Sequence, residues 1–86
     1  MATIDTVTFA GDYSGVTYDA QWGSFWIVSD QSRAIYLWDR VRGVRQEYPL
    51  NLPNIEGVAI DPATNRIYTV SDSENKLYVW QYQPPN

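Results

Sequence analysis

The chain has 86 residues, neither cysteine nor histidine, and a formal net charge of −4 at pH 7. A chain of this size buries only about 60% of its unfolded surface and is marginally stable alone. It lacks the residues for disulfides or a usual structural zinc site, so we expect association to supply stability. The acidic balance argues against a nucleic-acid partner, and no apolar run is long enough to span a membrane. No secretory signal is recognised, so the cytoplasm is the default location.

Short alternating runs rich in β-branched and aromatic residues, bounded by Asp, Asn, Ser, Gly or Pro, predict antiparallel strands throughout. The predicted strands are residues 2–9, 15–18, 25–29, 34–39, 44–50, 58–60, 67–70 and 77 to about 81. A turn is predicted at residues 61–65, where Asp precedes Pro. Residues 83–86 contain two prolines, which lack the ladder donor, so no central strand is expected there.

The stretch from Ser14 to Arg40 recurs from Glu56 to Tyr82 without a gap, at an offset of 42 residues. The identical pairs are Gly15/Gly57, Val16/Val58, Asp19/Asp61, Val28/Val70, Ser29/Ser71, Asp30/Asp72, Tyr36/Tyr78 and Trp38/Trp80. A period of about 40–45 residues carrying several short strands is typical of a β-propeller blade. The alternative is two hairpins that are alike by chance, and the gapless register argues against it.

The two repeats differ in their fourth strand. Residues 44–50 supply one for repeat one, whereas repeat two has none and residues 2–9 have no blade of their own. Continuing the offset backwards places Thr3–Phe9 on Arg45–Asn51, the register of an outermost strand. We therefore expect Ala2–Phe9 to complete repeat two of another copy; the alternative is that this segment frays.

These features predict an all-β protein with a β-propeller fold and two four-stranded blades per chain. Blade one would cover about residues 14–50, and blade two about residues 56–82 plus strand 2–9 of a neighbouring chain. Each blade stacks on two neighbours, and propellers have roughly four to eight blades. We expect homo-oligomerisation to complete the ring, as a six-bladed trimer or, second, as an eight-bladed tetramer.

Three short motifs recur in both repeats: Glu or Ser before Gly-Val-x-x-Asp, then Val-Ser-Asp, and then Ile or Leu before Tyr-Leu/Val-Trp. The pattern resembles blades of the SdiA-regulated (YjiK-like) propellers and of the wider NHL-like and esterase-like phytase propellers. Members of these families carry all blades on one chain, so this chain is similar to a fragment-sized or engineered version. Residues 35–39 also resemble the end of a WD-repeat strand, without that family's Gly-His pair. In size the chain is similar to two-bladed lectins that trimerise, whose Trp/Cys pattern it lacks.

The resemblance also implies a metal site. In the phytase-like and YjiK-like families, a Glu at the place of Glu56 points toward the channel mouth and can ligate a metal. Repeat one has Ser14 there, so a trimer would present three Glu56 alternating with three Ser14. Asp30 and Asp72 are expected on the same face, and converging carboxylates suit Ca²⁺ or Mg²⁺. The alternatives are turn capping by the Ser-Asp pairs and a solvated charge at Glu56.

Other candidate ligand-binding residues are aromatic or basic. Trp22 falls in a predicted turn, where it could stack on a sugar ring or pack between blades. Arg40, Arg42 and Arg45 cluster around another turn, where they could bind a phosphate or carboxylate or remain solvated.

The sequence contains few of the residues that usually carry out catalysis. Without His and Cys, Ser-His-Asp, Cys-His and His-metal chemistry are excluded, whereas metal-assisted hydrolysis on carboxylates alone stays open. Asp19 and Asp61 are expected to form turns, and Trp26, Trp38 and Trp80 to form the core. We predict a non-enzymatic, self-assembling binding module or scaffold, natural or designed. The alternatives are a carbohydrate-binding lectin and a metal-dependent, phytase-like phosphoesterase.

Overall fold

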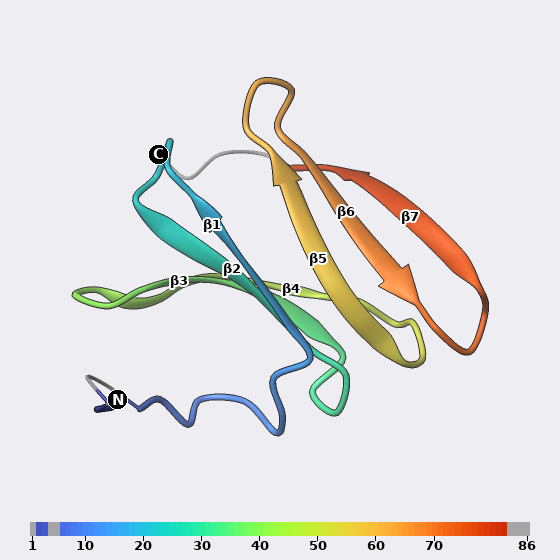
Figure 1. The fold of residues 1–86 in the computed structure, drawn as a ribbon, viewed down its shortest axis with the longest axis horizontal. Helices are drawn as coiled ribbons and strands as arrows, with labels where there is room; N and C mark the ends of the chain where they lie inside the picture. Colours follow the sequence, from blue (N-terminus) through green and yellow to red (C-terminus); the bar gives the residue numbers. More distant parts are fainter. Residues whose placement is uncertain (1, 4–5, 83–86) are drawn as a thin grey trace.

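The computed structural model describes residues 2–3 and 6–82, which form two antiparallel β-sheets and contain no helix. Sheet one has the strand order β1-β2-β3-β4, and sheet two has the order β5-β6-β7 (Figure 1). The strands are β1 Gly15–Asp19, β2 Ser24–Ser29, β3 Ala34–Asp39, β4 Gly43–Pro49, β5 Ile55–Asp61, β6 Arg66–Ser71 and β7 Lys76–Gln81. The all-β prediction is confirmed, and no described segment is a helix that could cross a membrane.

The hairpin turns of the two sheets share one backbone conformation at equivalent positions, which here means positions 42 residues apart. Gly23 and Asn65 have φ of 62° and 55°, and Arg33 and Asn75 have φ of 50° and 55°. Each of them is the last turn residue before a strand, a place that tight hairpins often fill with a left-handed residue. Glycine and asparagine adopt this conformation readily, whereas an arginine does so rarely. The repeat in the sequence is therefore also a repeat in backbone structure.

The strand registers are equivalent too: Phe25 pairs with Trp38 as Ile67 pairs with Trp80. The largest difference from the predicted boundaries is at β5, which begins at Ile55, three residues before the predicted start. The run of residues that predicted this strand covers only the centre of β5, and backbone pairing with β6 extends the strand beyond it.

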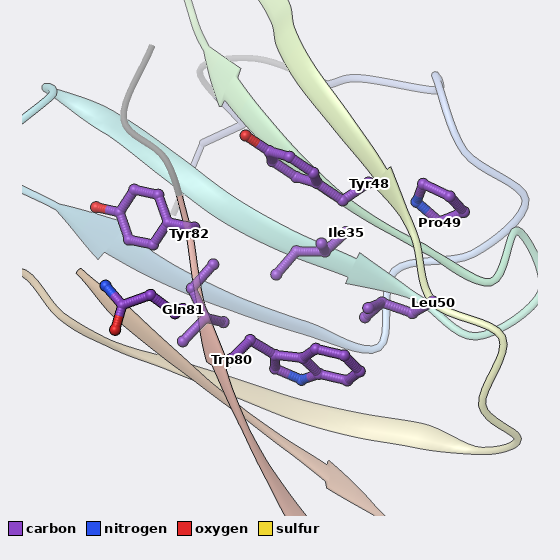
Figure 2. Close-up of a pocket in the computed structure, with 8 residues that line it drawn as sticks. Ile35, Tyr48, Pro49, Leu50, Trp80, Gln81 and Tyr82 are labelled. Atoms are coloured by element: carbon purple, nitrogen blue, oxygen red, sulfur yellow. The ribbon is translucent and has the colours of Figure 1, made fainter.

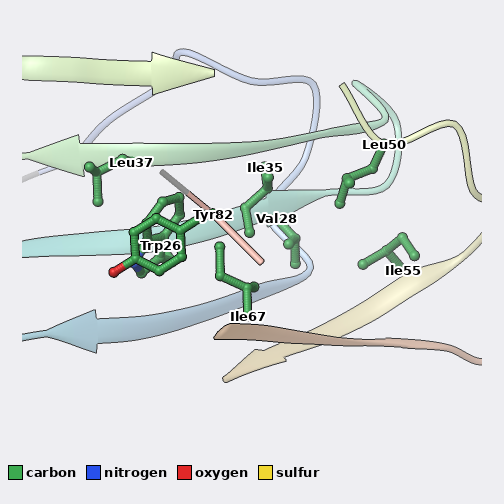
Figure 3. Packing of buried hydrophobic residues seen from close by; sticks show 8 residues of the cluster. All are labelled: Trp26, Val28, Ile35, Leu37, Leu50, Ile55, Ile67 and Tyr82. Atoms are coloured by element: carbon green, nitrogen blue, oxygen red, sulfur yellow. The ribbon is translucent and has the colours of Figure 1, made fainter. Parts of the chain in front are cut away.

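The hydrophobic core lies between the two sheets, on one face of each. Figure 3 shows its buried members, which are Trp26, Val28, Ile35, Leu37, Leu50, Ile55, Ile67 and Tyr82. Because side chains alternate along a strand, each sheet also has a second face that points away from this core. We call the two core-facing surfaces the inner faces and the two opposite surfaces the outer faces.

The described residues of the predicted strand at 2–9 do not form a strand in this chain. Residues 2–3 and 6–8 have no strand pairing, and the backbone bends at residues 9–11. An alternating sequence forms a strand only where a neighbour completes its hydrogen bonds, so the pattern alone was insufficient. Pairing with another copy stays a prediction, and residues 4–5 and 83–86 lie outside the described part.

Candidate functional site

A buried polar cluster joins the end of β1 to the end of β7. The Asp19 side chain is fully buried, and its Oδ2 accepts hydrogen bonds from Trp26 Nε1 at 3.0 Å and Tyr82 Oη at 3.1 Å. Its Oδ1 accepts the amide of Gln21 at 3.1 Å, and Tyr82 Oη accepts Trp22 Nε1 at 3.2 Å. Asp19 therefore forms its turn as predicted, but it also connects the two sheets, which the sequence did not indicate.

The surroundings of Tyr82 change its acidity. Burial raises the pKa of the Tyr82 phenol, and the Asp19 carboxylate adds to this, while the hydrogen bond from Trp22 acts in the opposite direction. The neutral phenol is therefore favoured, and its hydroxyl can donate a hydrogen bond to the Asp19 carboxylate.

The backbones of β1 and β5 approach closely at two glycines. A Cβ built on Gly15 would lie 3.0 Å from Gly57 Cα and 3.2 Å from Val58 N, so only glycine fits without a shift. A Cβ built on Gly57 would meet nothing within 4 Å, because it points to the outer face of sheet two. Gly57 is the equivalent of Gly15, yet nothing in the described chain uses its missing side chain.

A second set of polar contacts joins the sheets at the opposite end. Asp30 Oδ1 accepts the amide of Ile55 at 3.2 Å, where β5 begins. Ser71 Oγ donates to Pro53 O at 2.8 Å, and the amide of Asp72 donates to Asn54 O at 3.1 Å. Three members of the two Ser-Asp pairs, which are Asp30, Ser71 and Asp72, therefore secure the segment that enters β5.

Ser29 does cap its turn, as the capping alternative predicts. Its Oγ accepts the amide of Ser32 at 3.1 Å and donates to Asp12 Oδ1 at 2.6 Å. These bonds hold the segment before β1: the Ser29 hydroxyl, followed by the amide of Gln31, lowers the pKa of Asp12.

The three candidate metal ligands lie at the same end of the sheets. Asp30 contacts the residue before Glu56, and Asp72 contacts the loop that leads to it. The Glu56 side chain is exposed. Within the described residues, however, no three acidic side chains are grouped so that they could hold a metal ion.

The candidate ligand-binding residues are dispersed. Trp22 donates to Tyr82 across the sheets, which favours the packing alternative for its indole. Arg40 and Arg42 are exposed in the turn between β3 and β4, where the amides of Val41 and Arg42 bond to the Asp39 carboxylate. The bond from Val41 is the main cause of the lowered pKa of Asp39.

The outer face of sheet two is apolar and exposed. It carries Val70, Leu77 and Val79, which are 45%, 61% and 56% exposed. Their equivalents on the inner face of sheet one are Val28, Ile35 and Leu37, which are 0%, 3% and 0% exposed. This apolar surface is thus buried against a neighbouring sheet in sheet one, whereas its equivalent in sheet two is exposed.

The outer face of sheet one is the equivalent of the inner face of sheet two. Val16 and Tyr18, the counterparts of Val58 and Ile60, are exposed large hydrophobic residues. Tyr18 packs on Phe25, whose ring lies 5.9 Å from that of Trp38.

Phe9 lies against this same outer face. Its ring centroid is 5.4 Å from Tyr13, 5.0 Å from Tyr36 and 6.4 Å from Trp38. The segment before β1 therefore approaches sheet one from its outer side.

A cavity of about 340 Å³ opens between the outermost strands of the two sheets. Figure 2 shows Tyr48 and Leu50 on one side and Trp80 and Tyr82 on the other. It lies next to β7, the edge strand of sheet two, at the place where β4 completes sheet one. A fourth strand on β7 would lie beside this cavity.

Sequence reasoning missed Tyr82, the inter-sheet role of Asp19 and Asp30, and the close approach at Gly15. The second repeat has the same residues at the positions equivalent to Asp19, Asp30 and Gly15. This recurrence was the signal in the sequence that could have pointed to their roles. Tyr82 has Arg40 at its equivalent position, so no identity marked it.

Two sheets with equivalent hairpins, packed face to face, define an all-β repeat protein. The chain belongs to the SdiA-regulated family, whose model matches residues 1–81. The resemblance inferred from the three motifs is confirmed for that family. Among curated proteins and among solved structures, nothing matches the chain.

Proposed function

We propose that the chain is a non-enzymatic binding module that assembles from copies of itself into a closed β-propeller. Sheet one is blade one and sheet two is blade two. A six-bladed trimer is the expected form, and an eight-bladed tetramer is the second candidate. The observation that carries the proposal is the exposed apolar outer face of sheet two, whose equivalent on sheet one is buried.

Burial of this face supplies the driving force. Covering a Val or Leu side chain completely contributes about 1.5–3 kcal/mol, and each of Val70, Leu77 and Val79 has about half of its surface left to cover. Contiguous exposed patches of this kind mark interaction surfaces in soluble proteins.

Both halves of the contact are present on one chain, which favours a second copy as the partner. The outer face of sheet one carries Val16, Tyr18, Phe25 and Trp38, equivalent to Val58, Ile60, Ile67 and Trp80 on the inner face of sheet two. Joining the outer face of sheet two to the outer face of sheet one in the next copy repeats the contact within the chain. Such a head-to-tail contact forms a ring when its rotation closes.

The N-terminal segment supports the same arrangement. Leu50, at the end of β4, packs between the sheets of one chain, and Phe9 packs on the outer face of sheet one. We expect the residues before Phe9 to continue as the fourth strand of a neighbouring blade two, beside β7 and its cavity. This strand exchange is part of the proposal.

A ring of this kind binds ligands at the ends of its central channel. Glu56, Asp30 and Asp72 share one end of the sheets, so a ring repeats their acidic groups around the channel mouth. The absence of His and Cys removes the usual nucleophile and base pairs, which favours binding over catalysis.

The test is the solution mass, measured by light scattering during size-exclusion chromatography. We expect three times the chain mass of 9.9 kDa. Val79→Lys should prevent assembly because it places an unpaired charge in the contact. Gly57→Val should also prevent assembly, because the equivalent Gly15 has no room for a side chain against the neighbouring sheet. Within its own chain, a Cβ at Gly57 would meet nothing within 4 Å.

The matched control is Val41→Lys, the same change at a valine that is 92% exposed in a turn. It should leave the mass unchanged. A monomeric wild type, or variants at positions 57 and 79 that assemble as the wild type does, would overturn the proposal.

A further inference from the structure

We infer that Asp61 of one copy binds Arg40 of the next copy, at the position where Asp19 binds Tyr82 within the chain. This inference rests on the proposed assembly. It assigns the two residues a recognition role between subunits.

The contact within the chain provides the geometry. Asp19 is the last residue of β1 in sheet one, and Tyr82 is the first residue after β7 in sheet two. They meet at the end of the inner faces, with Tyr82 Oη 3.1 Å from Asp19 Oδ2. The contact therefore belongs to the way in which one sheet stacks on the other.

The repeat transfers this contact to the subunit interface. The equivalent of Asp19 is Asp61, the last residue of β5, and the equivalent of Tyr82 is Arg40, the first residue after β3. When the next copy stacks on sheet two as sheet two stacks on sheet one, its Arg40 faces Asp61. The contact between copies would thus have the Arg40 cation where the contact within the chain has the neutral phenol of Tyr82.

Asp61 has the chemistry to accept this cation. In the chain its Oδ1 accepts the amide of Ala63 at 3.1 Å, and its Oδ2 accepts the hydroxyl of Thr64 at 2.9 Å. A carboxylate has about four acceptor sites, so both oxygens can accept a further bond. A guanidinium can donate to both oxygens at once, and such charge-assisted pairs are stronger than neutral hydrogen bonds.

A second polar contact at the opposite end of the face supports the same placement. Asp30 accepts the amide of Ile55 within the chain, and the equivalents are Asp72 and Tyr13. In the assembly Asp72 would accept the amide of Tyr13 from the next copy. Asp61 and Asp72 would thus engage the same neighbour at both ends of its outer face.

The experiment compares the concentration dependence of assembly for charge variants. We expect Arg40→Glu to weaken association by roughly tenfold or more, because it places two carboxylates opposite each other. Arg42→Glu is the matched control: it makes the same charge change two residues away and should alter association less than twofold. Asp61→Lys combined with Arg40→Glu should restore assembly through a reversed pair.

Rescue by the double variant separates a contact between subunits from an effect of Arg40 inside its own chain. A tyrosine at the same position offers a further check: Arg40→Tyr reproduces the internal contact, so it should assemble and be less sensitive to salt than the wild type. If Arg40→Glu assembles like Arg42→Glu, or if Asp61→Lys fails to rescue it while wild type forms an oligomer, the pairing is wrong and the propeller proposal stands. A monomeric wild type overturns both.

Discussion

Asp19 is the residue on which the junction between the two sheets depends most directly. A buried carboxylate is costly unless donors surround it, and its three donors come from Gln21, Trp26 and Tyr82. They belong to the β1–β2 turn, to β2 and to the segment after β7. Loss of one donor therefore affects both sheets.

Replacing Tyr82 by Phe tests this cluster. The change removes one donor to Asp19 and the acceptor for Trp22, so we expect the free energy of unfolding to fall by about 1–3 kcal/mol. Denaturant unfolding measures it. Tyr78→Phe, which removes a surface hydrogen bond to Glu74, is the control and should cost less. Equal losses in the two variants would argue against the cluster.

The same variant should change the response to alkali. The folded pKa of Tyr82 is raised above the ordinary value of 10.0, mainly by burial. Its contribution to stability is thus present below pH 10 and is lost as the pH rises through the folded pKa. Wild type should therefore lose more stability than Tyr82→Phe between pH 9 and pH 11, with Tyr78 contributing equally to both proteins.

At the scale of elements, β7 is the strand whose surroundings differ most from those of its equivalent. β3 pairs with β4 on its far side, whereas β7 is the edge of sheet two in the described chain. An edge strand has unpaired backbone groups that invite another strand. The cavity beside β7, lined by Tyr48, Trp80 and Tyr82, is where side chains of such a strand would lie.

Deleting residues 2–9 tests whether the N-terminal segment is that strand. The truncated chain should no longer form the discrete oligomer, because β7 would remain an open edge in every copy. Light scattering and circular dichroism report assembly and folding. Phe9→Ala, which removes the aromatic contacts to Tyr13, Tyr36 and Trp38 but keeps the rest of the segment, should reduce assembly less. A truncated chain with the wild-type mass and a normal spectrum would disprove strand exchange.

On the scale of the whole molecule, cyclic assembly would convert one exposed carboxylate into a ring. Each copy would place one Glu56 at the channel mouth, so a trimer would have three that repel one another. Like charges held at short range cost stability unless a cation or protons neutralise them. The rigid stacking of blades would keep the carboxylates from moving apart.

Glu56→Gln should therefore leave Tm unchanged or raise it in buffer with EDTA. Millimolar Ca²⁺ or Mg²⁺ should raise the Tm of the wild type and not that of the variant, because a ligand stabilises the state that binds it. Glu47→Gln, an exposed glutamate on β4, should respond to the metals as the wild type does. An equal metal response with and without Glu56 would place the cation elsewhere, with Asp30 and Asp72 as the next candidates.

Sequence patterns alone were enough to predict the strands after residue 14, their turns, the repeat and the family. These features depend on short-range patterns: β-branched and aromatic alternation for the strands, and Asp, Asn or Gly at the turns. The offset of 42 residues needed only the comparison of one half with the other. The shared left-handed turns at Gly23 and Asn65 show that this likeness extends to the backbone.

Which surfaces of the repeat are buried could be known only from the packing of the two sheets. Asp19 and Asp61 are the same residue at equivalent positions, but Asp19 meets Tyr82 from the far end of the chain, whereas the bonds of Asp61 among the described residues stay within its own turn. Val28 and Val70 are likewise identical, and one is buried and the other exposed. The same local pattern has two outcomes because burial depends on the sheet that stacks against it, and no sheet covers the outer face of sheet two within the described chain.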